Sequence, residues 1–307
     1  MIPKLIQKIQ KTQAPICVGL DPMLEFIPQY LLEEEKKNHG ATLQAICQAV
    51  WRFNQEIIDN VFDLIPAVKL QIAMYEQWGA EGVCLFQKTI LYAKEKGLIV
   101  IGDVKRGDIH STAHAYALAH LGKTEAFGKK FTGFNEDFIT VNPYLGSDGI
   151  MPFIQICQEE NKGIFVLVKT SNPSSGEFQN QKIQEKFLYE MVAEKVHEWG
   201  KTCPSGDYSL VGAVVGATYP QEAKLIRKLL PHSYFLVPGY GAQGGKAKDL
   251  KAFFHTNGLG AIVNSSRGII AAYQQENYKQ FPEQEFASVA RLAVIEMIQD
   301  LRHEILN

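Results

Sequence analysis

The chain has 307 residues, of which 46% are hydrophobic and 21% are charged, and its formal net charge is -2. This composition predicts a globular protein with enough apolar residues for a large core. The near balance of charge gives no electrostatic reason to expect nucleic acid or an anionic membrane as a partner. No apolar stretch approaches the roughly 18 residues of a membrane span, so we expect no membrane association.

The opening segment, "MIPKLIQKIQKTQ", contains too many polar residues for a secretory signal and predicts a short amphipathic helix. The 5 cysteines are an odd number and form no CxxC pair, so we expect a reduced, cytoplasmic protein without a thiolate metal site. The 8 histidines show no HExxH or similar spacing, and we predict no bound metal.

Short, almost wholly apolar runs alternate with longer helical patterns along the chain. We predict strands at residues 16–20, 66–70, 98–103, 137–142, 164–170, 210–216, 234–238 and 259–264. Continuous apolarity is typical of parallel strands that are covered on both faces. Eight β/α units in about 250 residues predict a TIM (β/α)8 barrel of class α/β. An open, doubly wound sheet is the alternative, but no GxGxxG follows the first strand.

No linker divides the sequence, so we expect residues 1–307 to form a single domain with polar loop insertions near 31–40, 121–136 and 200–209. In TIM barrels the functional groups lie at the carboxyl ends of the strands. The polar residues predicted at those ends are Asp21, Lys69, Asp103, Lys105, Asn142 and Ser171. Charged groups therefore converge at one end of the predicted barrel.

The loops after the last two predicted strands are typical of a phosphate site. The first of them, "VPGYGAQGG" at 237–245, is rich in glycines whose backbone N–H groups can approach an anion. Such glycines alone are better explained by tight turns. Arg267 follows the next strand and offers a guanidinium that binds phosphate with two hydrogen bonds, so the pair of loops favours phosphate binding.

The segment "LIVIGDVKRGDIHST" at 98–112 concentrates opposed charges after a buried strand. Residues two apart in an extended chain point to the same side, so Asp103 and Lys105 are expected to share the pocket, with Lys69 approaching from the neighbouring strand. Asp108 lies further along, where the chain enters a helix that we expect the Ser111/Thr112 region to cap. A buried ion network that only closes the barrel mouth remains the structural alternative.

The stretch "DVKRGDIHSTA" resembles the D-x-K-x-x-D-I signature of the orotidine 5'-phosphate decarboxylase family, which catalyses the last step of UMP synthesis. The resemblance covers nearly the whole chain and includes "GLDP", "VKLQIAMYEQWG", "TVNPYLGSD", "VKTSNPSSGEFQ", "VPGYGAQGG" and "NSSRGI". The last three are most similar to the longer bacterial subgroup, type 2. The resemblance implies decarboxylation of orotidine 5'-phosphate to UMP with no cofactor and no metal.

The resemblance also implies roles for individual residues. Asp21 and Lys69 would bind ribose hydroxyls, and Asp103 would lie against the substrate carboxylate. Lys105 would protonate C6 after carbon dioxide leaves, and Ser171 would contact the pyrimidine edge. The other residues of the implied substrate site are Asn142, Pro238, Gln243 between base and phosphate, and Gly244, Gly245 and Arg267 on the phosphate.

In this family the second aspartate of the signature and the residues after it reach the active site of the partner subunit. Asp108, Ile109 and Thr112 would do so here, which implies a homodimer with shared active sites. His110 stands where many members have a small residue, and we interpret it as a neutral packing residue.

Two other functions remain open. Metal-dependent sugar-phosphate decarboxylases and lyases share the barrel and the D-x-K-x-x-D motif, but they need an acidic metal ligand where this chain has Lys69. The other candidate is a phosphate-binding barrel without catalytic activity. The intact series of two lysines and two aspartates argues against that function.

Overall fold

In the computed structural model of the chain, the described residues are 1–241, 244–245 and 247–305. Eight parallel strands form a closed barrel in the order β1-β14-β13-β12-β7-β6-β3-β2, so the predicted TIM barrel is confirmed. The strands are β1 (Ile16–Leu20), β2 (Ala67–Gln71), β3 (Ile99–Arg106), β6 (Phe138–Val141), β7 (Gly163–Lys169), β12 (Val211–Val215), β13 (Phe235–Val237) and β14 (Ala261–Ser265). Each predicted strand range overlaps one of them.

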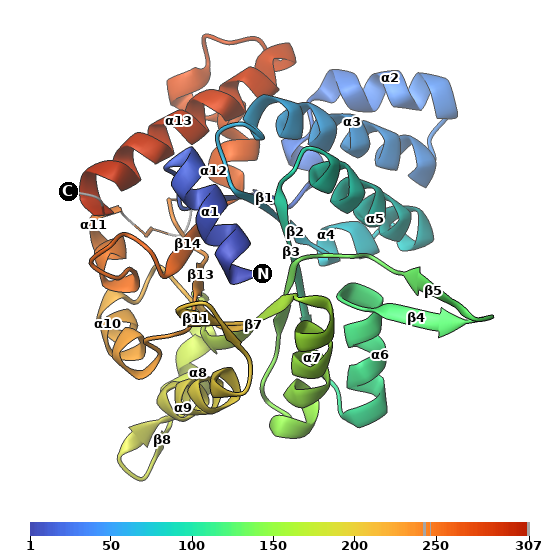
Figure 1. Ribbon diagram of the computed structural model, residues 1–307. Helices are drawn as coiled ribbons and strands as arrows, with labels where there is room; N and C mark the ends of the chain where they lie inside the picture. The colour runs from blue at the N-terminus through green and yellow to red at the C-terminus, as the bar shows by residue number, and fades with distance from the viewer. Residues whose placement is uncertain (242–243, 246, 306–307) are drawn as a thin grey trace.

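Helices surround the barrel (Figure 1). They are α1 (Ile2–Thr12), α2 (Gln29–His39), α3 (Leu43–Val61), α4 (Ala73–Glu76), α5 (Gly79–Glu95), α6 (His110–His120), α7 (Ser147–Glu160), α8 (Gly176–Gln179), α9 (Leu188–Lys201), α10 (Pro220–Leu229), α11 (Ala247–Leu250), α12 (Arg267–Ile270) and α13 (Phe286–Ile305). Short 3-10 helices lie at Leu24–Phe26, Pro173–Ser175, Lys251–Phe253, Ala272–Gln274, Glu276–Tyr278 and Glu283–Glu285.

The barrel strands are buried on both faces, as their continuous apolarity predicts. Every residue of β1, β6, β12, β13 and β14 is buried. The predicted amphipathic helix at the amino terminus is α1, which buries Ile2, Leu5 and Ile9 and lies across the barrel in the view of Figure 1. Among the described residues, no helix combines the length and the apolarity that crossing a bilayer requires.

The three polar insertions are not simple loops. Residues 31–40 lie largely within α2. This helix is held against the rest of the protein by the buried Leu31 and by Arg52 of α3, which binds the Glu34 and Glu35 carboxylates at 2.7 and 3.0 Å. The second insertion forms an antiparallel hairpin that projects beside α6 in Figure 1, β4 (Lys123–Ala126) with β5 (Lys129–Thr132). The third contains the hairpin of β10 (Pro204–Ser205) and β11 (Tyr208–Ser209).

A further hairpin, β8 (Lys182–Ile183) with β9 (Lys186–Phe187), follows α8 and leads into α9. The sequence patterns missed these hairpins because their strands, of two to four residues, carry no usable alternation of polar and apolar residues.

The third barrel strand is irregular where the charges gather. Gly102 pairs with Ile139 and Arg106 pairs with Val141, so residues 103–105 of β3 lie opposite Thr140 alone. Lys105 has a φ of 43°, a left-handed conformation that costs a lysine free energy and therefore needs support from its surroundings. This bulge places Asp103 and Lys105 at the mouth of the barrel.

Candidate active site

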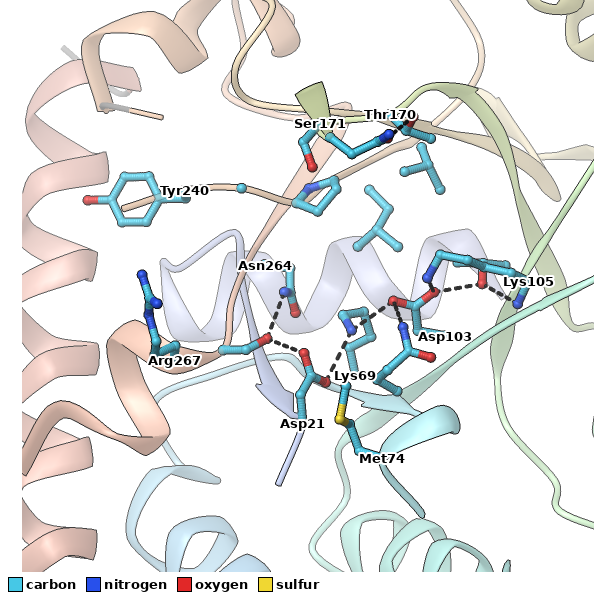
Figure 2. Close-up of a pocket in the computed structure, with 18 of the residues that line it drawn as sticks. Asp21, Lys69, Met74, Asp103, Lys105, Thr170, Ser171, Tyr240, Asn264 and Arg267 are labelled. Carbon is cyan, nitrogen blue, oxygen red and sulfur yellow. Dashed lines mark hydrogen bonds and ion pairs between the residues drawn. The ribbon is translucent and has the colours of Figure 1, made fainter. Parts of the chain in front are cut away.

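A cavity of about 840 Å³ opens at the carboxyl ends of the barrel strands. Seven of the predicted site residues line it, and these are Asp21, Lys69, Asp103, Lys105, Ser171, Pro238 and Arg267. Figure 2 shows Asp21, Lys69, Asp103 and Lys105 in one row, with Arg267 beyond the Asp21 end. The strand ends that carry these seven residues therefore open into one cavity.

The row is a chain of ion pairs. The Lys69 ammonium lies 3.3 Å from Asp21 and 2.9 Å from Asp103, and the Lys105 ammonium lies 2.6 Å from the other Asp103 oxygen. The Lys69 side chain is 4% exposed, whereas that of Lys105 is 46% exposed and faces the cavity. The interior cation is therefore fixed, and the cation at the mouth is accessible to a ligand.

Burial and neighbouring charge act in opposite directions on this row. Burial alone would raise the pKa of Asp103, but Lys69 and Lys105 outweigh it and hold that pKa well below its ordinary value of 3.8. Burial alone would lower the pKa of Lys69, and Asp103 and Asp21 reverse that effect and raise it. Asp103 is therefore an anion and Lys69 a cation at neutral pH.

Each oxygen of Asp103 accepts from one cation and one neutral donor. Oδ1 accepts from Lys105 and from the Thr140 hydroxyl at 2.9 Å, and Oδ2 accepts from Lys69 and from the Gln71 amide at 3.1 Å. Thr140 also accepts the Lys105 backbone N–H at 2.9 Å, which ties the left-handed residue to β6. Four donors hold the carboxylate in one orientation.

Thr140, Gln71, Asn264 and Ser266 line the cavity, and the sequence interpretation assigned a role to none of them. Gln71 follows Lys69 by two residues and pairs with Asp103 in the register of β2 and β3. Ser266 follows Asn264 by two, and its hydroxyl donates to Asp21 at 2.7 Å. The two-residue period that predicted Asp103 and Lys105 would also have found Gln71, two residues after the predicted Lys69.

Among the described residues, Asn142, Gly244 and Gly245 were also predicted in the site but do not line this cavity. Asn142 is exposed, and its side-chain oxygen accepts the Tyr144 N–H at 3.0 Å, because Thr140 rather than Asn142 faces the barrel mouth. The N–H groups of Gly244 and Gly245 donate to Gly241 and Gly239 within their own loop. Gln243 lies outside the described residues.

Asp108, Ile109 and Thr112 also lie away from this cavity, at the start of α6. The expected cap by the Ser111/Thr112 region is wrong, because Ile109 is the N-cap residue and no side chain caps the helix. Asp108 instead accepts the Ile109 N–H at 2.8 Å. The His110 side chain is 74% exposed, so within this chain it is not a packing residue.

Comparison with known proteins decides the family. The model described as "Orotidine 5'-phosphate decarboxylase / HUMPS family" matches residues 14–281. The chain belongs to this family. The orotidine 5'-phosphate decarboxylase of Caldicellulosiruptor bescii is 46% identical over 284 residues, which cover 92% of this chain and 93% of that protein.

Solved structures of the orotidine 5'-phosphate decarboxylase family support the same conclusion. Leishmania donovani OMP decarboxylase superposes with a TM-score of 0.70 at 28% identity, over 97% of this chain and 98% of that one. Leishmania donovani UMP synthase superposes with a TM-score of 0.74 at 30% identity. That match covers 98% of this chain and 56% of the synthase. That this chain belongs to the longer bacterial subgroup of the family stays a prediction from the three motifs.

Proposed function

We propose that this chain catalyses the cofactor-independent decarboxylation of orotidine 5'-phosphate to UMP in pyrimidine synthesis, with Lys105 as the proton donor to C6. Membership of the decarboxylase family supplies the reaction. The observation that carries the mechanism is the pairing of the accessible Lys105 ammonium with the fixed Asp103 carboxylate at the cavity mouth.

In this mechanism the C6–carboxylate bond breaks and its electron pair stays on C6. The nearby Lys105 ammonium stabilises that charge more strongly in the transition state than in the ground state, which lowers the barrier. Lys105 then transfers a proton to C6 and, because it is accessible, regains one from solvent. The Asp103 charge repels the substrate carboxylate, and this repulsion is relieved as carbon dioxide leaves.

The remaining cavity residues bind the nucleotide. Arg267, at the opposite end of the row from Lys105, would hold the phosphate, while Ser171 and Pro238 would contact the base. Asp21 and Lys69 would bind the ribose. The roles predicted for Asn142, Gln243, Gly244 and Gly245 stay predictions, and Gly244 and Gly245 would have to break bonds within their loop to donate to a phosphate.

We further propose a homodimer in which Asp108, Ile109 and Thr112 complete the cavity of the partner subunit. All three lie outside the cavity of their own chain. Ile109 is 50% exposed, and the exposed apolar side chains of Tyr144, Leu145 and Met151 lie on the loop and helix that follow β6. An apolar surface next to a catalytic loop is typical of a protein interface.

One continuous cluster of buried hydrophobic residues runs from Met1 to Ile305, which supports treating residues 1–307 as a single domain. A cytoplasmic location stays a prediction from the cysteine pattern.

The test is the loss of orotidine 5'-phosphate absorbance on mixing with the protein, with and without EDTA. We expect equal rates in both, because the cation Lys69 stands where metal-dependent barrel enzymes need an acidic ligand and would repel Mg²⁺. A rate lost with EDTA and restored by Mg²⁺ would favour the metal-dependent alternative. A flat trace in both conditions would favour a barrel that only binds phosphate.

A further inference from the structure

The Asn264 side chain, near the carboxyl end of β14, presents an unused acceptor to the active-site cavity. The residue is 6% exposed and lines the cavity. Its Oδ1 is buried and has no hydrogen-bond donor among the residues that the structure describes. A buried polar atom without a partner is unfavourable, so such atoms in a binding cavity point to a partner that the ligand supplies.

Neighbouring hydrogen bonds fix which end of the Asn264 amide faces the cavity. The Asp21 carboxylate only accepts, so the single Ser266 proton is donated to it, at 2.7 Å. Ser266 must then accept from Asn264, whose Nδ2 lies 3.2 Å away. This order of donors leaves Asn264 Oδ1 without a partner. Rotating the amide by 180° would place Oδ1 against the Ser266 oxygen, and both atoms would then be acceptors.

The backbone around Asn264 is shaped to hold this arrangement. Asn264 pairs with Cys17 in the register of β14 and β1, two residues from Gly19. A Cβ atom on Gly19 would collide with Ser266 and lie 3.2 Å from Asn264 Oδ1. A glycine at that position therefore leaves room for both side chains to reach the Asp21 end of the row (Figure 2).

An unpaired carbonyl beside a carboxylate selects a ligand group that donates hydrogen bonds. The nucleotide of the proposed function has such donors on its ribose hydroxyls and at the imide N–H of the base. Ser171, which would contact the base, lies across the cavity from Asn264 (Figure 2), whereas Asp21 and Lys69 lie next to it. The ribose is the part of the nucleotide that fits this end.

We propose that Asn264 is a substrate-binding residue that accepts a hydrogen bond from a ribose hydroxyl and so selects ribonucleotides over their deoxy analogues. The proposal rests on the proposed function, because it takes the ligand to be a pyrimidine nucleotide. It adds a determinant of sugar specificity to the charged row.

The test measures binding of UMP, 2'-deoxy-UMP and 3'-deoxy-UMP by titration calorimetry to the wild type, Asn264→Leu and Asn264→Ala. Leucine keeps the volume and removes the acceptor, and alanine serves if leucine prevents folding. We expect either substitution to reduce the preference for UMP over one deoxy analogue about 10-fold, the usual value of one hydrogen bond in a buried site. Affinity for that analogue itself should change by less than about twofold.

Asn54→Ala is the matched control. Its Oδ1 is also buried and without a donor among the described residues, but Asn54 packs against Tyr75 and Thr89 outside the cavity. This variant should keep the wild-type preference. An unchanged preference in both Asn264 variants, or an equal loss of affinity for all three nucleotides, overturns the proposal. Failure of the proposed function would instead appear as absent turnover of orotidine 5'-phosphate, independently of these binding ratios.

Discussion

The two ends of the barrel each hold lysines bound to a buried aspartate, but of these two clusters only the one at the carboxyl ends lines the cavity. At the amino ends of the strands, Asp137 accepts from Lys94 at 2.9 Å, from Lys162 at 3.4 Å and from the Val100 N–H at 3.0 Å. At the carboxyl ends, Asp103 accepts from Lys69 and Lys105. The charges are alike and their surroundings differ.

The difference lies in how fully the protein satisfies the lysines. Lys162 also donates to the Glu136 carbonyl at 2.7 Å and the Asn135 side chain at 3.0 Å, so all three of its protons have partners. Burial lowers the pKa of Lys162 to about 8 despite Asp137. The Lys105 ammonium donates only to Asp103 among the described residues and lines the cavity. The Lys105 ammonium therefore keeps N–H donors for a ligand, whereas the three donors of the Lys162 ammonium are already used.

Removing the accessible cation should have the largest effect. Lys105→Ala is expected to lower kcat by about 10⁴-fold or more, because both the proton donor and the charge that stabilises C6 are lost. Affinity for UMP, measured by calorimetry, should survive because UMP carries no carboxylate at C6.

Lys94→Ala is the matched control, since it removes a lysine from the other cluster. Its kcat should equal that of the wild type in whatever fraction remains folded. Near-normal turnover in Lys105→Ala would contradict the role of Lys105 as proton donor.

The amino-end cluster should matter for stability instead. Asp137→Ala leaves the buried Lys162 ammonium, the half-buried Lys94 ammonium and the Val100 N–H without their carboxylate. We expect a loss of about 3–5 kcal/mol in the free energy of unfolding. Urea unfolding measures this value. The exposed pair Lys195–Glu198 supplies the control, because Glu198→Ala should leave the urea midpoint unchanged.

Acid offers an independent check on Asp137. Burial alone would raise its pKa, but Lys162 and Lys94 outweigh burial and hold it below the ordinary value of 3.8. A carboxyl group whose pKa is lower in the folded state stabilises the fold above its unfolded pKa, and that stability is lost as pH falls through the folded value. The wild type should therefore lose stability below about pH 4 more steeply than Asp137→Asn. Equal slopes would refute the assignment.

Arg267 tests the far end of the row. Arg267→Ala should raise KM for orotidine 5'-phosphate by about 100-fold, since two charge-assisted hydrogen bonds to the phosphate are lost. The unphosphorylated nucleoside should bind the variant and the wild type alike. If the wild type itself showed equal kinetics on nucleoside and nucleotide, the assignment of Arg267 to the phosphate would be wrong.

The smallest effect is expected at Thr140, which supports the bulge without contacting the reacting atoms. Thr140→Val removes the donor to Asp103 and the acceptor of the Lys105 N–H, and we expect kcat to fall about 10-fold with little change in KM. Thr140→Ser keeps the hydroxyl and should restore most of the rate. A valine variant with wild-type kcat would show that Lys69, Gln71 and Lys105 suffice to hold Asp103.

Much of the barrel and its charged row could be predicted from the sequence. Continuous apolar runs mark strands covered on both faces, and parallel strands in a closed barrel must present their carboxyl ends at one rim. Once the strands were recognised, the charged residues at their carboxyl ends could be placed together at this rim. These residues are Asp21, Lys69, Asp103, Lys105 and Arg267. Local patterns suffice where each residue's position follows from its own strand.

Only the tertiary structure decided which neighbours complete the site. The bulge at residues 103–105 leaves Thr140 alone opposite them, so Thr140 rather than Asn142 reaches Asp103, and strand periodicity does not show such a shift. Ser266 and Asp21 are 245 residues apart in sequence and bond only because β14 closes the barrel against β1. Contacts between distant strands depend on closure and register, and no local pattern of residues contains that information.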